Sequence, residues 1–200
     1  LNGTNPGAGN RPATDYSLSE CSNRNCDRRR DYLKAVTSLL VSDLDEMVYN
    51  WQPGGAAYVD LMQKGPDGRL ATILTGMGSL AYGELAGERI RLGLLLNDPE
   101  EEHDCFSDNT HNSHYYDALG IKNVYMGSYE RINGEVVRGA SLASLMAQES
   151  PGLAAQMLAR IESTELAMEV LLAEAARGNT FDVLIACNNL EGEEVVSRVV

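Results

Sequence analysis

The chain has 200 residues, of which 44% are apolar and 6% aromatic, and its formal net charge is −13. So negative a chain repels the phosphate backbone, and its densest basic cluster, Arg28–Arg30, is too small to offset that charge, so we expect no nucleic-acid partner. The best apolar run, Leu92–Leu96, is far shorter than the about 20 residues that span a bilayer, so we expect no transmembrane segment. Abundant Ala, Leu, Met and Glu favour helices.

Residues 1–26 predict an irregular lead-in, because they are rich in Asn, Gly, Pro, Ser and Thr and have little periodicity. The chain begins at Leu1 without an apolar leader, so either a leader has been removed or the chain starts inside a longer product. Cys21 and Cys26 lie close enough to close a small disulfide ring, and the alternative is a pair of free or buried thiols. A disulfide there would indicate an oxidising compartment. Cys105 and Cys187 can pair only if the fold brings them together.

A long amphipathic helix is predicted over residues 27–51, and Pro53 and the two glycines after it end it. Its apolar residues recur at spacings of three and four: Leu33, Val36, Leu40, Leu44, Met47 and Trp51. A short helix is expected over 56–64, a turn at Gly65–Gly68, and a second long helix over 69–96.

Asn97–Glu102 predicts another helix start, with a capping residue, a proline and three carboxylates, and we expect that helix to reach Tyr116. Asn133-Gly134 predicts a turn between two short extended pieces of a mixed segment, and a small hairpin is one way to arrange them. Helices are then expected over 141–149, from Pro151 to Gly178, and from about Thr180 to Val200. Together these elements predict an all-α antiparallel helical bundle over residues 27–200, with an irregular insertion around 117–140 and a last helix that is cut short.

Two carboxylates stand out in the second long helix. On a wheel of about 100° per residue, Glu84 and Glu88 fall within the apolar stripe that should be buried. A buried carboxylate needs a positive partner, which could be a metal ion, Arg89 or Arg91, or a basic group on another helix. An internal salt bridge is the plainer of these interpretations.

All three histidines of the chain fall within twelve residues: His103, His111 and His114. If the segment is helical, His103, Ser107, Asp108 and His111 point broadly one way, as nitrogen and oxygen ligands of a transition metal would. They could equally be ordinary surface residues. The chain has no His-Glu-x-x-His, Gly-x-Ser-x-Gly or P-loop motif, so no self-contained catalytic site is evident.

Two segments carry a family resemblance: Gly83–Arg89 (GELAGER) and Glu101–His111 (EEHDCFSDNTH) look like the paired signature of the imelysin family. Leu1–Pro12, Gly120–Gly127 and Gly139–Leu142 also resemble its pattern, so the likeness covers nearly the whole chain. The Gly-x-His-x-x-Glu motif of that family is absent, and the chain resembles the portion that follows it.

The resemblance implies an all-α protein of the bacterial envelope, periplasmic or associated with the outer membrane, and linked to iron uptake. It implies two partners: the upstream half of the same polypeptide, and a metal or a small metal-bearing ligand. Iron or zinc is the cofactor it suggests. The residues that match the two motifs, together with the histidine cluster, form the expected metal- or ligand-binding set: Glu84, Glu88, Arg89, Glu102, His103, Ser107, Asp108, Asn109 and His111.

Three functions remain open at this point. The first is a metal-binding envelope protein in which Glu84, Glu88 and His103 help to hold the ion. The second is a metallopeptidase of the insulin-cleaving imelysin type, although this chain carries no complete catalytic motif and no catalytic residue can be named. The third is a non-catalytic scaffold in which the polar cluster only fixes helix register.

Overall fold

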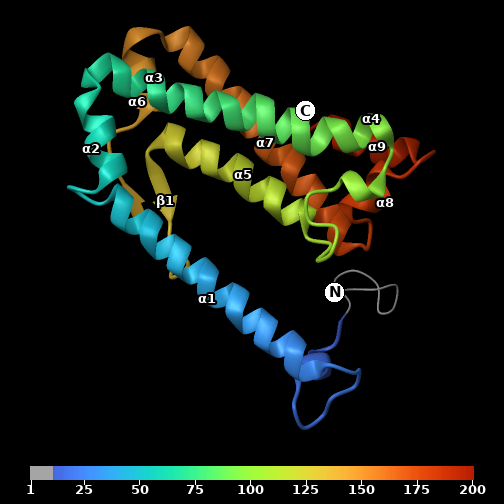
Figure 1. Cartoon of the computed structure of the whole chain (residues 1–200). Helices are drawn as coiled ribbons and strands as arrows, with labels where there is room; N and C mark the ends of the chain where they lie inside the picture. The colour runs from blue at the N-terminus through green and yellow to red at the C-terminus, as the bar shows by residue number, and fades with distance from the viewer. Residues whose placement is uncertain (1–10) are drawn as a thin grey trace. The chain divides into compact units, whose positions relative to one another are not determined.

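The computed structural model describes residues 11–200, so the first ten residues of the predicted lead-in lie outside it. The all-α prediction is confirmed: the regular secondary structure of residues 11–200 is helical apart from one two-stranded hairpin (Figure 1). No helix in this part of the chain combines the length and the apolarity needed to cross a membrane. The chain divides into two compact units between Gly76 and Met77, and each is described by itself.

The first unit contains a single turn of 3-10 helix, η1, followed by two α-helices and most of a third. Their bounds are η1 Ala13–Tyr16, α1 Cys26–Trp51, α2 Ala56–Gln63 and α3 Gly65–Gly78. A disulfide joins Cys21 to Cys26 at the start of α1. Buried Asp15 anchors the segment before α1 through an ion pair with Arg11 (2.5 Å) and a hydrogen bond from the Ser22 hydroxyl (2.8 Å).

Helix α1 matches its prediction within one residue, but its apolar stripe is not buried: the six predicted positions are 38–57% exposed. The turn predicted at Gly65–Gly68 is wrong. Lys64 alone lies between α2 and α3. Gly65 opens α3 at φ +70°, and Pro66 follows in its first turn, where the missing N–H costs nothing.

The second unit begins at the end of α3 and contains all remaining elements. Their bounds are η2 Ser79–Arg91, α4 Leu92–Leu96, η3 Pro99–Glu101, α5 Thr110–Met126, β1 Ser128–Glu130, β2 Val136–Arg138, α6 Leu142–Glu149, α7 Pro151–Ala176, α8 Phe181–Ile185 and α9 Leu190–Ser197. Helices α5 and α7 lie side by side, and η2 packs against α5 (Figure 1).

Element η2 is a π-helix that continues α3 without a break and passes directly into α4. In a π-helix each residue lies over the residue five positions further on, instead of three or four as in an α-helix. The buried residues of η2 follow this spacing, since they are Leu85 and Ile90. Both belong to a core formed with α7, α8 and the C-terminal residues: Leu85, Ile90, Met168, Leu171, Phe181, Leu184, Ile185, Val196 and Val199.

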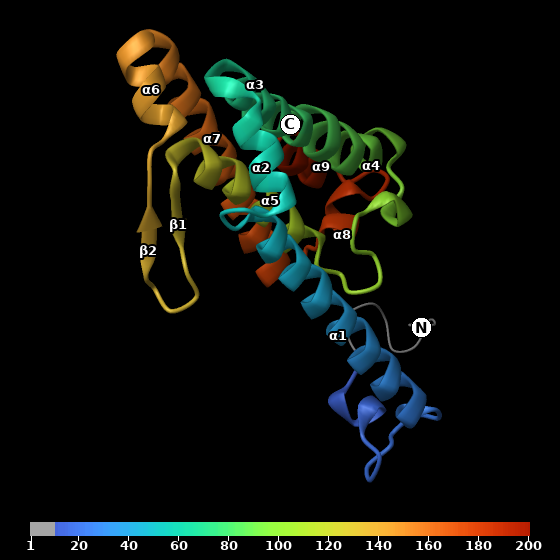
Figure 2. The same ribbon diagram turned by 60° about the vertical axis from the view of Figure 1, so that its left-hand side comes forward.

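The predicted irregular insertion around 117–140 is more regular than expected. Helix α5 continues to Met126, and an antiparallel hairpin of β1 and β2 follows (Figure 2). In its register Tyr129 lies opposite Val137. Gly127 makes the transition at φ +59°, and a Cβ there would lie 2.5 Å from the carbonyl oxygen of Ala140. The hairpin predicted around Asn133-Gly134 is therefore present.

The single helix predicted from Thr180 to Val200 is wrong, because residues 186–189 interrupt it. Asn188 adopts φ +67°, and the Asn189 side chain then accepts a hydrogen bond from the Gly192 N–H and caps α9. The resulting pair of short helices presents buried Phe181, Leu184 and Val196 to the core.

Candidate functional site

The segment between α4 and α5 is a loop with one turn of 3-10 helix, not the long helix predicted from Asn97 to Tyr116. The start signal itself is correct, since the Asp98 side chain accepts a hydrogen bond from the Glu100 N–H and Pro99 opens η3. The helix fails to continue because Glu102 is extended (φ −70°, ψ 149°), and α5 begins only at Thr110. The expected alignment of His103, Ser107, Asp108 and His111 on one helical face therefore does not exist.

This loop turns the Glu102 side chain inward, where it is only 7% exposed. The hydroxyl of Thr110, the first residue of α5, donates a 2.9 Å hydrogen bond to Glu102 and accepts one from the Asp104 N–H (2.9 Å). Thr110 is fully buried, so a single hydroxyl ties the two ends of the loop together. The Ser113 hydroxyl, one turn into α5, donates to the Asp104 carboxylate.

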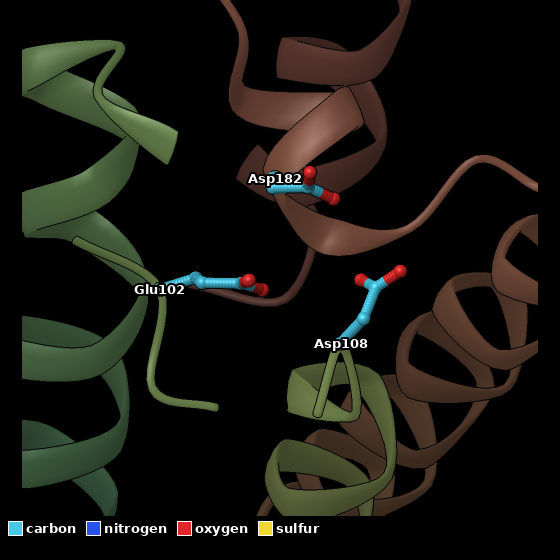
Figure 3. A group of neighbouring side chains, drawn as sticks. All are labelled: Glu102, Asp108 and Asp182. Carbon is cyan, nitrogen blue, oxygen red and sulfur yellow. The ribbon is translucent and has the colours of Figure 1, made fainter. Parts of the chain in front are cut away.

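Three carboxylates meet beside this loop: Glu102, Asp108 and Asp182, which we call the carboxylate cluster. One oxygen from each lies within 4.8 Å of the others. Figure 3 shows the three side chains coming from separate segments, with Asp108 just before α5 and Asp182 in α8. Asp108 reaches its position at φ +55°, and the Thr180 hydroxyl holds Asp182 with a 2.6 Å hydrogen bond.

The electrostatics of the carboxylate cluster are unbalanced. Burial raises the pKa of Glu102 to about 7, the Thr110 hydrogen bond opposes that shift, and the negative charges of Asp182 and Asp108 add to it. One oxygen of Asp108 is buried without a hydrogen-bond partner among the described residues. Converging carboxylate oxygens with an unsatisfied lone pair suit a hard divalent cation, which takes oxygen ligands.

The three histidines lie at different depths. His114 is fully buried, and its two ring nitrogens have no hydrogen-bond partner within residues 11–200. Burial lowers the pKa of His114 to about 4, and the neighbouring His103 adds to the shift. The His114 ring packs edge-on against Phe181 with centroids 5.0 Å apart, and the exposed His103 ring lies 6.4 Å away.

The prediction that Glu84 and Glu88 are buried is wrong, since both are exposed. The wheel assumed α-helical pitch, whereas the π-helix brings residues five apart together and turns these carboxylates outward. Glu84 instead pairs across one π-turn with Arg89, at 3.6 Å. This pair and Glu88 line a polar pocket of about 410 Å³, whose other wall includes Glu102 and His103.

The structure thus brings five of the nine predicted residues to one polar pocket and places Asp108 in the carboxylate cluster, which shares Glu102 with that pocket. The other three lie apart from both. Ser107 and Asn109 are exposed and make only local hydrogen bonds. The Ser107 hydroxyl donates to the Asp104 carbonyl (3.3 Å), and the Asn109 side chain accepts from the Asn112 amide in the first turn of α5 (2.8 Å). His111 is half-buried.

The sequence analysis missed Asp182. Thr110, although it lies in the second motif, and His114 were left out of the expected binding set. Asp182 lies 74 residues beyond Asp108 in the chain, and no local pattern connects the two. Thr110 did carry a signal, because a threonine at the first position of a helix that follows a loop often serves polar contacts there. That signal was hidden by the assumption that the helix began at Pro99.

In a comparison with known protein families, the model described as Imelysin matches residues 1–196. This covers almost the whole chain, including both segments that carry the resemblance. No curated protein matches the chain.

Proposed function

The chain belongs to the imelysin family, a family of the bacterial-envelope type, and from that premise we propose that it binds a divalent cation at the carboxylate cluster of Glu102, Asp108 and Asp182. The observation that carries this proposal is the convergence of three carboxylates within 4.8 Å around a buried Glu102. Each of the three charges raises the cost of ionising the others, and a cation bound between them would remove that cost.

The ligand set favours a hard cation over zinc. All three groups offer oxygen, and neither histidine nor cysteine belongs to the cluster. Oxygen ligands suit Mg²⁺, Ca²⁺, Mn²⁺ and ferrous iron, whereas zinc sites usually include nitrogen or sulfur. We propose ferrous iron as the physiological ion, because the resemblance links the family to iron uptake. We also propose that the protein is periplasmic or associated with the outer membrane and binds the ion there.

Calorimetric titration of the metal-free chain at pH 7.5 tests the proposal. We expect one site for Mn²⁺ or, without oxygen, for Fe²⁺, and at least a ten-fold loss of affinity in both Glu102→Gln and Asp182→Asn. Glu162→Gln, which removes an exposed carboxylate of α7 and the same unit of charge, is the matched control and should bind as the unaltered chain does. Equal weakening by all three variants would mean that only the general negative charge attracts the ion, and the site would be disproved.

A metallopeptidase is the second candidate, and one observation favours it. Glu102 of the carboxylate cluster borders the polar pocket that Glu84, Glu88 and Arg89 line. A metal held in the cluster would therefore lie close to two further carboxylates, Glu84 and Glu88, either of which could act as a general base. A metal bound in the cluster would supply Lewis-acid activation of water.

The hydrolase candidate requires a peptide to enter the polar pocket, with the Arg89 guanidinium facing it as a donor for the carbonyl oxygen. Metal-dependent cleavage of an unstructured peptide should then be lost in Glu102→Gln and slowed in Arg89→Gln. Cleavage that persists in Glu102→Gln would come from another protease. Metal binding without cleavage would support the metal-binding function and exclude the peptidase. If the chain neither binds metal nor cleaves peptides, only the scaffold function remains.

A further inference from the structure

A second cavity lies in the same unit, between η2, α5, α7 and the last two residues. It has a volume of about 250 Å³, and we call it the apolar pocket. Most of its wall is hydrocarbon: Leu85, Leu119, Met157, Ile161 and Val199. A cavity with such walls gains little from water and binds apolar molecules readily.

The pitch of the π-helix explains why this cavity exists. Ala81 and Ala86 are five residues apart, so the π-helix stacks them on one face, and both line the apolar pocket. Ala118 of α5 lines it from another side. Three methyl groups at the contact of two helices leave space that larger side chains would fill, while Leu85 and Val199, 4% and 6% exposed, form its floor.

One positively charged side chain at the apolar pocket has no ion-pair partner among residues 11–200. The Lys122 ammonium is paired with the Glu165 carboxylate at 2.5 Å, and both line the pocket. Arg160 of α7 also lines it, and no carboxylate of residues 11–200 forms an ion pair with its guanidinium. The Arg160 side chain is exposed, so its guanidinium can meet a charged group that arrives from solvent.

We propose that the apolar pocket binds a medium-chain carboxylic acid, with the chain among the three alanines and the carboxylate on Arg160. A guanidinium presents two parallel N–H donors that match a carboxylate. A single unpaired guanidinium fits a monoanion better than a phosphate dianion, which would also meet the Glu165 carboxylate. This site is separate from the carboxylate cluster, so the two proposals stand independently.

Decanoate is the probe, together with decanol and decyltrimethylammonium, which share its chain but carry no charge or a positive one. By calorimetry on the whole chain we expect one decanoate site. Arg160→Gln should weaken decanoate at least ten-fold and change decanol less than two-fold. Arg177→Gln, which removes an arginine of the same helix region that is paired with Glu174 outside the pocket, should leave decanoate binding unchanged.

Filling the apolar pocket gives the second test. Ala118→Leu and Ala86→Leu add volume from opposite walls, and each should abolish binding of both decanoate and decanol. Ala176→Leu adds the same leucine at an exposed position of α7 and should bind decanoate normally. If neither filled variant folds, as judged by circular dichroism, the Arg160→Gln comparison decides alone.

Three results would overturn the proposal. The first is no saturable decanoate binding. The second is equal binding of decanoate and decyltrimethylammonium, which would assign the affinity to hydrocarbon alone. The third is decanoate binding that survives a folded Ala118→Leu or Ala86→Leu variant, which would place the ligand on another apolar surface.

Discussion

The two family motifs differ in how they treat their carboxylates. Gly83–Arg89 exposes Glu84 and Glu88 and balances Glu84 with Arg89 at 3.6 Å. Glu101–His111 buries Glu102 and sets it beside two further carboxylates, with no cation among the groups that chiefly shift its pKa. Both segments are acidic, yet only in the second do neighbouring carboxylates and burial make ionisation of a glutamate unfavourable.

The cause of the difference is backbone geometry rather than composition. The π-helical pitch turns Leu85 and Ile90 inward and so turns the two glutamates outward. In the other motif, the early end of η3 lets Glu102 turn toward α8. Residues whose pKa is strongly shifted are candidates for function, and for that reason we propose the cation site at the second motif. The predictions below test this contrast.

The largest effect should come from the buried face of the π-helix. Ile90 is fully buried, five residues after Leu85, so Ile90→Ala should lower the free energy of unfolding by about 2–4 kcal/mol through lost burial and a cavity. Glu88→Ala, two residues away but exposed, should change it by less than about 0.5 kcal/mol. Urea denaturation measures both. A larger loss of stability in Glu88→Ala than in Ile90→Ala would mean that the segment has α-helical pitch and that Glu88 points into the core.

The second effect is a pH dependence of stability in metal-free protein. Glu102 has a folded pKa of about 7 against 4.5 for the free side chain, so its contribution is present below pH 4.5 and is lost as pH rises to 7. His114 has a folded pKa of about 4 against 6.5, so its contribution is present above pH 6.5 and is lost as pH falls to 4. The two contributions, each no larger than about 3.5 kcal/mol, oppose one another between pH 4.5 and 6.5.

Single variants separate these contributions. Glu102→Gln should become more stable as pH rises from 4.5 to 6.5, because His114 then acts without opposition. His114→Gln should become less stable over the same range, and the unaltered chain should change less than either. Urea midpoints in the presence of a chelator measure all three. Parallel pH profiles of stability for the two variants would show that neither the pKa of Glu102 nor that of His114 is shifted as described.

Much of this fold could be predicted from the sequence, because its long helices depend on local periodicity. Helices α1 and α7 begin and end within about two residues of their predicted bounds, and the hairpin follows from Asn133-Gly134. The predictions that failed concern the helical pitch of η2 and the points at which two predicted helices are interrupted. A π-helix has the same residue types as an α-helix, so nothing local distinguishes 100° per residue from the smaller rotation of η2.

The candidate site was predicted only in part, for a related reason. Glu102, His103 and Asp108 were found because they lie in one short motif. Asp182 comes to the cluster through the packing of α8, and α8 exists as a separate helix only because residues 186–189 interrupt the predicted one. Spacing along the chain carries no information about such a contact. The burial of Glu102, which gives the site its chemistry, also depends on tertiary packing.

The smallest predicted effects compare one polar contact from each motif. Thr110→Val keeps the shape of a fully buried side chain but removes the donor to Glu102 and the acceptor for the Asp104 N–H, so we expect a loss of about 1–3 kcal/mol in the free energy of unfolding. Because that hydrogen bond lowers the pKa of Glu102, the variant should raise this pKa further.

Arg89→Gln breaks a pair whose side chains are 42% and 55% exposed, so it should cost less than about 0.5 kcal/mol of the free energy of unfolding. Urea denaturation at pH 7.5 and NMR titration of the Glu102 carboxyl measure the two quantities. Equal losses in the two variants would mean that the motifs hold their carboxylates in similar surroundings, and the contrast between an exposed, paired motif and a buried, strained one would fail.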